Sequence, residues 1–148
     1  MRVEAAFKQV NRLFLDSAPV IYYVDINPDY LVIMDVVFDF VESGKVRVVT
    51  SPVTLAECLV LPMRQNNLLK QQQLIDIITS PETAEFVVIT SEIARCAADI
   101  RARYNLKLPD ALQVATAIVS NCEAFLTNDT QLKRVTELQV LVIEELEA

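Results

Sequence analysis

Short β-branched and aromatic runs alternate with longer segments of helical periodicity along this chain. Five runs are typical of strands, and they occupy residues 12–16, 45–50, 85–90, 124–127 and 138–143. Most of them are apolar at nearly every position, as expected for parallel strands that helices cover on both faces. Right-handed crossovers between parallel strands place helices on both sides of a sheet. We therefore expect an α/β fold with three layers, α/β/α, around a five-stranded parallel sheet.

The segments between these strands have the pattern of helices. We expect helices at residues 18–25, 29–43, 51 to about 62, 66–79, 91–104 and 108–121, and a short one at 130–135. Gly44 is expected to end the second helix as its C′ residue, and Ser91 to cap the fifth. Pro62 is expected to end or bend the helix that Ser51-Pro52 opens. Residues 1–11 predict a short helix or a loose arm without an assignable role, within a single domain spanning 1–148.

The composition of the 148 residues excludes several kinds of site. The single glycine excludes glycine-rich phosphate-binding loops. The absence of histidine excludes Ser-His-Asp and Cys-His catalysis and histidine-ligated zinc. The three cysteines lack CxxC spacing, so we interpret them as reduced packing residues of a cytosolic protein. Asp35 and Asp39 interrupt the most apolar long stretch, residues 31–41, so we expect no membrane-spanning segment.

Four acidic residues stand among apolar neighbours where a predicted strand ends or a predicted helix begins: Asp16, Glu57, Asp110 and Asp129. Ligand crevices of parallel α/β sheets lie beyond the carboxyl ends of the strands, so all four acids would point into one crevice. Converging carboxylates raise one another's pKa and need compensating positive charge. Hard oxygen donors without His or Cys indicate Mg²⁺ or Mn²⁺. Such metal pairs catalyse phosphodiester displacement, and they would allow a chain of net charge −7 to handle nucleic acid.

Each of these acids also has an interpretation as a helix-terminal residue. Asp16 and Asp129 are placed to cap the helices that follow them. Asp110 would complement the dipole of the helix that it begins. Thr54-Leu-Ala-Glu57 fits a capping box, with the glutamate at its last position. Taken one at a time, the acids favour this interpretation, whereas the cluster hypothesis depends on all four together.

Four segments of the sequence together carry a family resemblance. They are Phe14-Leu-Asp16-Ser-Ala-Pro-Val-Ile-Tyr-Tyr23, Thr54-Leu-Ala-Glu57, Leu108-Pro-Asp110-Ala-Leu-Gln-Val-Ala-Thr-Ala117 and Phe125-Leu-Thr-Asn-Asp129. In this order they resemble the PIN domain, and specifically the VapC-type toxin ribonucleases of bacterial and archaeal toxin–antitoxin pairs. The resemblance implies a five-stranded parallel sheet, a Mg²⁺-dependent endoribonuclease and a homodimer. It also implies neutralisation by a small antitoxin encoded alongside.

The same resemblance assigns roles to particular residues. The family's catalytic and metal-binding acids correspond to Asp16, Glu57, Asp110 and Asp129. Its supporting polar positions correspond to Ser17, Thr127 and Asn128. Basic residues that flank the predicted crevice are candidate RNA contacts, with a solvated helix face as the alternative, and they are Arg95, Arg101, Arg103, Lys107, Lys133 and Arg134.

Two other kinds of function remain open. A PIN-like module without catalysis would bind RNA or protein, although all four acids are present. An aspartate-based phosphatase of the haloacid-dehalogenase type would need a second Asp two residues after the first, where this chain has Ala18. A phosphotransfer receiver would need an Asp where the second strand ends in Thr50-Ser51 and a Lys where the last runs into Glu144-Glu145. We therefore expect a metal-dependent endoribonuclease, whose RNA target the sequence does not define.

Overall fold

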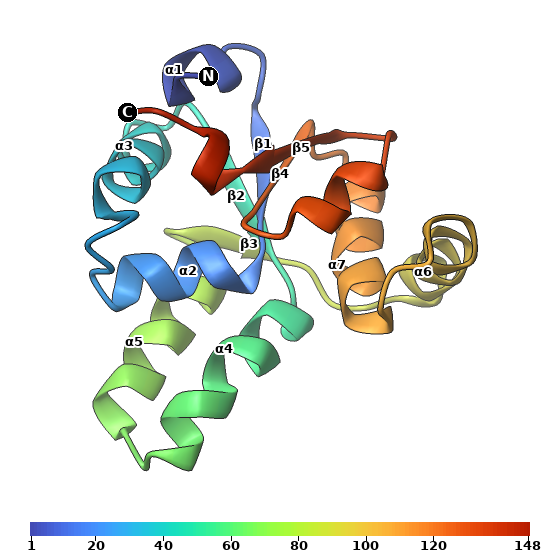
Figure 1. Ribbon diagram of the computed structural model, residues 1–148. Helices are drawn as coiled ribbons and strands as arrows, with labels where there is room; N and C mark the ends of the chain where they lie inside the picture. The colour runs from blue at the N-terminus through green and yellow to red at the C-terminus, as the bar shows by residue number, and fades with distance from the viewer.

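A five-stranded parallel sheet forms the centre of the computed structural model, which describes residues 1–148 (Figure 1). The strand order is β3-β2-β1-β4-β5, and every neighbouring pair is parallel. The strands are β1 (Arg12–Leu15), β2 (Arg47–Thr50), β3 (Ala84–Phe86), β4 (Ala124–Thr127) and β5 (Gln139–Val142). Helices lie on both faces of this sheet, so the expected three-layer α/β/α fold is confirmed.

Helices and 3-10 segments occupy the intervals between the strands. They are α1 (Val3–Ala6), α2 (Ser17–Val24), α3 (Leu31–Glu42), α4 (Pro52–Arg64), α5 (Leu68–Thr79), α6 (Ser91–Tyr104), α7 (Leu108–Val119), η1 (Thr130–Arg134) and η2 (Ile143–Glu145). None of these helices has both the length and the apolar character needed to cross a membrane.

Two hydrophobic clusters, one on each face of the sheet, follow from the alternation of side chains along the strands. Leu13 and Leu15 of β1 belong to the cluster that contains buried residues of α1 to α5. Phe14, between them, belongs to the cluster formed with α6 and α7. There its ring stacks on that of Phe125 in β4, with the ring centroids 5.0 Å apart. The strands are therefore buried on both faces, which explains their continuous apolar runs.

The observed helix boundaries depend on capping side chains. The hydroxyl of Ser51 caps α4 by accepting hydrogen bonds from two N–H groups of its first turn. The cap of α6 is Thr90 and not the expected Ser91, because the Thr90 hydroxyl accepts from the N–H of Ile93. Pro62 lies inside α4, which ends two residues later at Arg64, so of the two expectations for this proline, an end or a bend, the helix end is not found there.

The third strand is shorter than the sequence predicts. Hydrophobic residues continue to Ile89, but β3 ends at Phe86. β3 lies at the edge of the sheet and pairs only with β2, which itself ends at Thr50 opposite Phe86. Beyond that point β3 has no partner strand, so the ladder stops although the apolar run continues. At the end of α3, Gly44 has a positive φ of 78° after the C-cap residue Ser43, as predicted for a C′ glycine.

The N-terminal residues belong to the core and do not form a loose arm. Val3, Phe7 and Val10 are buried in the same cluster as one face of the sheet. The Val3 N–H donates to the carbonyl of Glu147 and the Glu147 N–H donates to the carbonyl of Met1, both at 2.8 Å. The expected short helix is present as α1, and its role is to cover apolar surface next to the C-terminal residues.

The interpretation of the cysteines as packing residues is confirmed. All three thiols are free. Cys58 and Cys122 are buried in the two hydrophobic clusters, and Cys96 is half-buried beside the second of them.

Candidate active site

The four acids singled out from the sequence lie at the carboxyl ends of two central strands and on two neighbouring helices (Figure 1). Asp16 follows β1, and Asp129 follows β4, the strand next to β1 in the sheet. Glu57 is in the second turn of α4, and Asp110 is in the first turn of α7. This edge of a parallel sheet is where ligands bind in open α/β folds.

Asp16 is the most strongly fixed of the four acids. Only 7% of its surface is exposed, and both of its carboxylate oxygens accept hydrogen bonds. Oδ1 accepts from the backbone N–H of Ser17 at 2.7 Å and from Nε2 of Gln113 at 2.9 Å. Oδ2 accepts from the hydroxyl of Thr127 at 2.7 Å. These three donors hold the Asp16 carboxylate in one orientation.

Gln113 links two of the acids and is a residue to which sequence reasoning gave no role. Its side chain is fully buried, and its Nε2 donates to Asp16 Oδ1 and to Glu57 Oε1, the latter at 2.7 Å. Its Oε1 accepts from the hydroxyl of Thr54 at 2.9 Å. The sequence carried one signal for this role, because Gln113 lies one helical turn after Asp110 among apolar residues.

Electrostatic interactions join the remaining acids to this pair. Burial raises the pKa of Glu57 above its ordinary value, and the charges of Asp16 and Asp110 raise it further. Burial also raises the pKa of Asp110, followed by the charges of Asp16 and Asp129, while Lys107 acts in the opposite direction. None of the five ion pairs of the protein includes one of these four acids. Repulsion therefore acts between Glu57 and both Asp16 and Asp110, and between Asp110 and both Asp16 and Asp129, and none of these acids has an ion-pair partner.

The helix-capping interpretation is correct for three of the acids and wrong for the fourth. Asp16 is the N-cap of α2, Asp129 caps η1 through the N–H of Gln131, and Asp110 lies in the first turn of α7. Glu57 does not close a capping box, because α4 begins at Pro52 and Ser51 is its cap. Capping and clustering are compatible here, because the helices begin where the strands end and direct their N-termini at one crevice.

The chemistry of the donors fits a hard divalent cation. Carboxylates and hydroxyls are the ligands that Mg²⁺ and Mn²⁺ prefer, and this crevice combines four carboxylates with the hydroxyls of Ser17 and Thr127. No three acidic or cysteine side chains of the protein are arranged to enclose a metal ion as they stand. The Gln113 amide bridges Asp16 and Glu57.

Two of the three supporting polar residues predicted from the sequence, Ser17 and Thr127, contact these acids. The Ser17 hydroxyl lies 3.4 Å from both Asp16 Oδ1 and Glu57 Oε1. Thr127 is fully buried, and its hydroxyl accepts from the N–H of Asp129 while donating to Asp16. One threonine thus fixes the relative position of the acids that follow β1 and β4.

Asn128 points away from the acids into a second polar network. Its Nδ2 donates to the hydroxyls of Tyr22 at 3.2 Å and Tyr30 at 3.3 Å, and its Oδ1 accepts from the N–H of Glu144. The Tyr30 hydroxyl donates to Oε1 of Glu144 at 2.9 Å, and the two tyrosine rings stack with their centroids 4.3 Å apart. Asn128 therefore anchors the segment that carries Asp129 to α2, α3 and η2.

The structure provides four of the six basic residues with protein partners. Arg103 pairs with Asp99 and Glu137, and Lys133 pairs with Glu145. The side chains of Arg101 and Arg134 donate to the backbone carbonyls of Leu106 and Tyr104 respectively. Arg95 and Lys107 are exposed and form no ion pair or side-chain hydrogen bond. All six remain predicted RNA contacts, and the last two are the most available.

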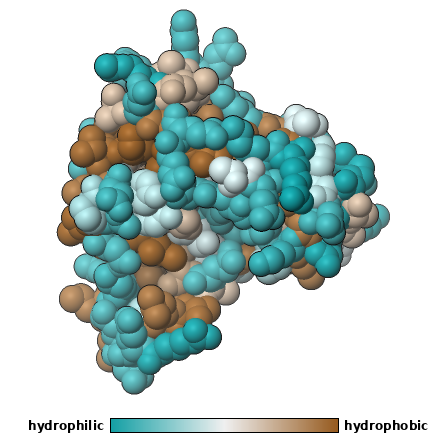
Figure 2. Space-filling model, viewed as in Figure 1, coloured by the Kyte–Doolittle hydropathy of each residue, from teal (hydrophilic) through white to brown (hydrophobic).

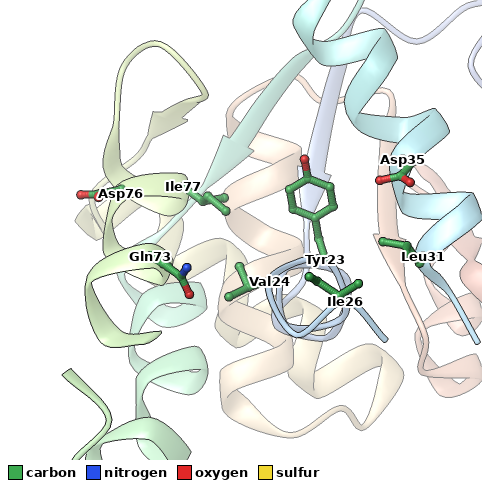
Figure 3. Close-up of a pocket in the computed structure, with 8 residues that line it drawn as sticks. All are labelled: Tyr23, Val24, Ile26, Leu31, Asp35, Gln73, Asp76 and Ile77. Carbon is green, nitrogen blue, oxygen red and sulfur yellow. The ribbon is translucent and has the colours of Figure 1, made fainter. Parts of the chain in front are cut away.

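The largest cavity of the protein, of about 530 Å³, is separate from the acids (Figure 3). Residues of α2, α3 and α5 line it, with Tyr23 and Ile77 facing its interior and Asp35 and Asp76 at its sides. It contains none of the four acids of the crevice. Cavity size alone would therefore point away from the site that the carboxylates define.

Comparisons with known proteins identify the family and the fold. The sequence profile of the PIN domain matches residues 13–138. This protein belongs to the PIN domain family. The family resemblance of the sequence segments is thereby confirmed. A search of curated proteins found no match.

Solved structures share the PIN fold at low sequence identity. VapBC2 from Rickettsia felis, bound to a DNA fragment from its promoter, has a TM-score of 0.71 and 18% identity over 88% of this chain and 98% of that one. A toxin–antitoxin complex from Klebsiella pneumoniae has a TM-score of 0.66 and 20% sequence identity, over 88% of this chain and 97% of that one. Mycobacterium tuberculosis VapC20, a sarcin–ricin loop cleaving toxin, has a TM-score of 0.66 and 15% sequence identity, over 86% of this chain and 98% of that one. The TM-scores show that this protein and the three structures share one fold, although their sequence identities are low.

Proposed function

We propose that this PIN domain is a divalent-metal-dependent endoribonuclease, with Asp16, Glu57, Asp110 and Asp129 as its metal-binding and catalytic residues. The observation that supports this proposal most strongly is that Gln113 joins Asp16 to Glu57 and Thr127 joins Asp16 to Asp129, while none of the four acids has an ion-paired partner. The pKa of Asp110 is raised by burial and then by the charges of Asp16 and Asp129. Repulsion of this kind destabilises the fold unless a cation or a proton binds, so it is more consistent with a functional site than with a structural one.

The four acids would have different tasks at a phosphodiester. Asp16 is held at both oxygens and would be a rigid ligand. Glu57 uses Oε1 to accept from Ser17 and Gln113, which leaves Oε2 free to face a ligand or a water molecule. The raised pKa values of Glu57 and Asp110 make these carboxylates better proton acceptors than ordinary ones. When bound, Mg²⁺ or Mn²⁺ would neutralise phosphate charge and activate the attacking water.

Cleavage of a mixed-sequence single-stranded RNA pool, with Mg²⁺ or with EDTA, tests this proposal directly. We expect cleavage only with the cation, and products that carry a 5′-phosphate and a 3′-hydroxyl, because water and not the ribose 2′-hydroxyl attacks the phosphorus. Asp129→Asn should abolish cleavage. Products with 2′,3′-cyclic phosphates would contradict the proposal. RNA binding without cleavage at any Mg²⁺ concentration would favour the catalytically inactive module.

We also propose that a small antitoxin binds this protein and places an Arg or Lys side chain beside the acids. Two observations support it: similar solved structures include toxin–antitoxin complexes, and the crevice is acidic. A guanidinium would bind carboxylates bidentately in place of a cation. A purified complex that kept full Mg²⁺ affinity would contradict this mode of inhibition. A homodimer and a cytoplasmic location also remain predictions, which light scattering and cell fractionation would test.

A further inference from the structure

A second, smaller pocket opens directly beside the carboxylate cluster. It has a volume of about 270 Å³ and lies between α2, α4 and α5. Glu57 belongs both to its lining and to the cluster of acids. Any group bound here would therefore be next to whatever the four carboxylates bind. The larger cavity of Figure 3 has no such residue in common with the acids.

The walls of this pocket are apolar and its rim is polar. Ile21 of α2, Leu61 of α4 and Leu74 of α5 contribute hydrophobic surface. The side chains of Gln65 and Asn67 stand on the turn between α4 and α5. Hydrophobic side chains are also exposed at the end of this helical hairpin, in the lower part of Figure 2. The pocket thus combines flat apolar surface with amide donors and acceptors at its edge.

Backbone hydrogen bonds fix the turn that carries these amides. The carbonyl of Pro62 accepts from the N–H of Asn67 at 2.9 Å and from Nε2 of Gln71 at 3.2 Å. The Asn67 side chain caps α5 by accepting from the N–H of Lys70, so its Oδ1 is engaged and its Nδ2 is not. The amide of Gln65 forms no hydrogen bond within the protein and is exposed. Two amide groups on a fixed turn are therefore available to a ligand.

The pocket also has one cationic side chain. Lys70 lines it and pairs with Asp25 of α2 at 2.5 Å, which joins α5 to α2. This ammonium is the only positive charge among the lining residues. Asp25 neutralises it, and Glu57 is the other charged residue of the lining.

We propose that this pocket binds one unpaired nucleobase of the RNA, next to the phosphate that faces the acids. This inference rests on the proposed ribonuclease function. The volume is just below the range of pockets for drug-sized ligands, which suits a single base better than a peptide helix. Single-stranded RNA is recognised through bases that are splayed out against side chains and hydrogen-bonded at their edges. Leu61 and Ile21 provide the surface for the faces of the base, and Gln65 and Asn67 bind its edge.

Two substitutions on α4 test this assignment as a matched pair. Leu61 is 59% exposed and lines the pocket, whereas Val60 is 47% exposed and does not, so a tryptophan at either position should leave the fold intact. Steady-state cleavage of the mixed RNA pool and calorimetric titration with Mg²⁺ would be measured for both. We expect Leu61→Trp to raise KM about tenfold, because the larger indole fills the space that the base would occupy, without changing Mg²⁺ affinity. Val60→Trp should match the unmodified protein.

A third variant reports on the edge of the base. Gln65→Ala should change the nucleotide preference beside the cut, which sequencing of the cleaved ends would detect, while leaving the melting temperature unchanged. Equal KM values for Leu61→Trp and Val60→Trp, together with an unchanged preference for Gln65→Ala, would overturn the proposal. The proposal would also be overturned if Leu61→Trp left RNA cleavage unchanged and weakened only the inhibition of cleavage by a basic protein, since the pocket would then bind protein and not a base. If the unmodified protein cleaves no RNA, the proposed function itself fails, and this inference fails with it.

Discussion

Asp16 and Glu57 are held together by a neutral amide and not by a positive charge. The two N–H groups of Gln113 satisfy one oxygen of each carboxylate, but they leave the net charge of the cluster unchanged. The amide therefore orients the acids and preserves the repulsion that favours cation binding. A leucine at this position would remove one donor from each carboxylate, leaving Asp16 with Ser17 and Thr127 and Glu57 with Ser17 alone. An ammonium there would compete with a metal.

We expect Gln113→Leu to lower the free energy of unfolding in EDTA by about 1–3 kcal/mol, because it removes one donor from each carboxylate and the acceptor of the buried Thr54 hydroxyl. Urea denaturation would measure the change. Thr116→Val is a suitable control on the same helix, since Thr116 is also fully buried but its hydroxyl donates only to the helical carbonyl of Leu112. The control should lose less stability. Equal losses in both variants would mean that Gln113 serves packing alone.

Asp110 allows the repulsion to be measured. Its pKa is raised above 3.8, so its ionisation costs more in the folded state than in the unfolded state. The stability due to this shift is present below pH 3.8 and is lost as the pH rises through the folded pKa. Asp110→Asn should therefore melt higher than the unmodified protein in EDTA at neutral pH, and this difference should vanish in acid.

Divalent cations should reduce or reverse the difference in melting temperature between Asp110→Asn and the unmodified protein. At 100 times Kd, Mg²⁺ would stabilise the unmodified protein by about 2.7 kcal/mol, and the variant by less. A helix-dipole role alone would instead make Asp110→Asn less stable by about 0.3–1 kcal/mol, with or without the cation. Melting curves with Mg²⁺ and with EDTA distinguish the metal-binding role of Asp110 from the helix-dipole role. If Asp110→Asn is less stable than the unmodified protein in EDTA and still cleaves RNA, Asp110 acts only at the end of its helix.

The sequence indicated the four acids and their supporting hydroxyls because each stands at a boundary between a strand and a helix. It did not indicate Gln113, Tyr30 or Glu144, whose roles depend on contacts between distant segments. Glu144, for example, reaches Tyr30 and Asn128 only because η2 folds beside the start of α3. Residue patterns predict which side chains lie at the crevice, whereas the partners that orient them emerge from tertiary packing.

At the scale of elements, the hydrophobic pattern predicted each strand and helix because periodicity is a local property. The exceptions have non-local causes. β3 stops where its partner β2 stops, although its own sequence remains apolar to Ile89. α1 is only four residues long, and what makes it stable is the core beneath it and the C-terminal residues beside it. Neither cause can be inferred from a window of a few residues.

The packing of α1 leads to a prediction about stability. Val3 has no exposed surface, so Val3→Ala should lower the free energy of unfolding by about 1–3 kcal/mol through lost burial and an unfilled cavity. Glu4→Ala, at the exposed neighbouring position, should change it by less than about 0.5 kcal/mol. Thermal or urea denaturation would compare them. An equally small effect of both changes would show that α1 contributes little to the core.

At the scale of the whole molecule, the net charge of −7 opposes RNA at long range. Arg95 and Lys107 are the candidate contacts without a protein partner, so about two phosphate contacts are expected. The logarithm of RNA affinity should then fall with the logarithm of salt concentration with a slope of about −1.4.

Fluorescence anisotropy with a labelled single-stranded RNA, at constant Mg²⁺ and with Asp129→Asn to prevent cleavage, would give this slope. Lys107→Ala should make it shallower by about 0.7. Arg103→Ala, which removes a side chain already paired with Asp99 and Glu137, should change it less. A slope several times steeper would require basic contacts beyond these six residues.

The hydrogen bonds between Met1, Val3 and Glu147 bring the two ends of the chain together, so the polypeptide is almost a closed ring. A few Gly and Ser residues would connect Ala148 to Met1, and new termini would be opened at Gly44, which is exposed and has open space around it. Such a circular permutant should fold, melt close to the parent and cleave RNA in Mg²⁺ as the parent does. The sheet would then carry β2 as the first strand of the polypeptide, with its spatial order unchanged.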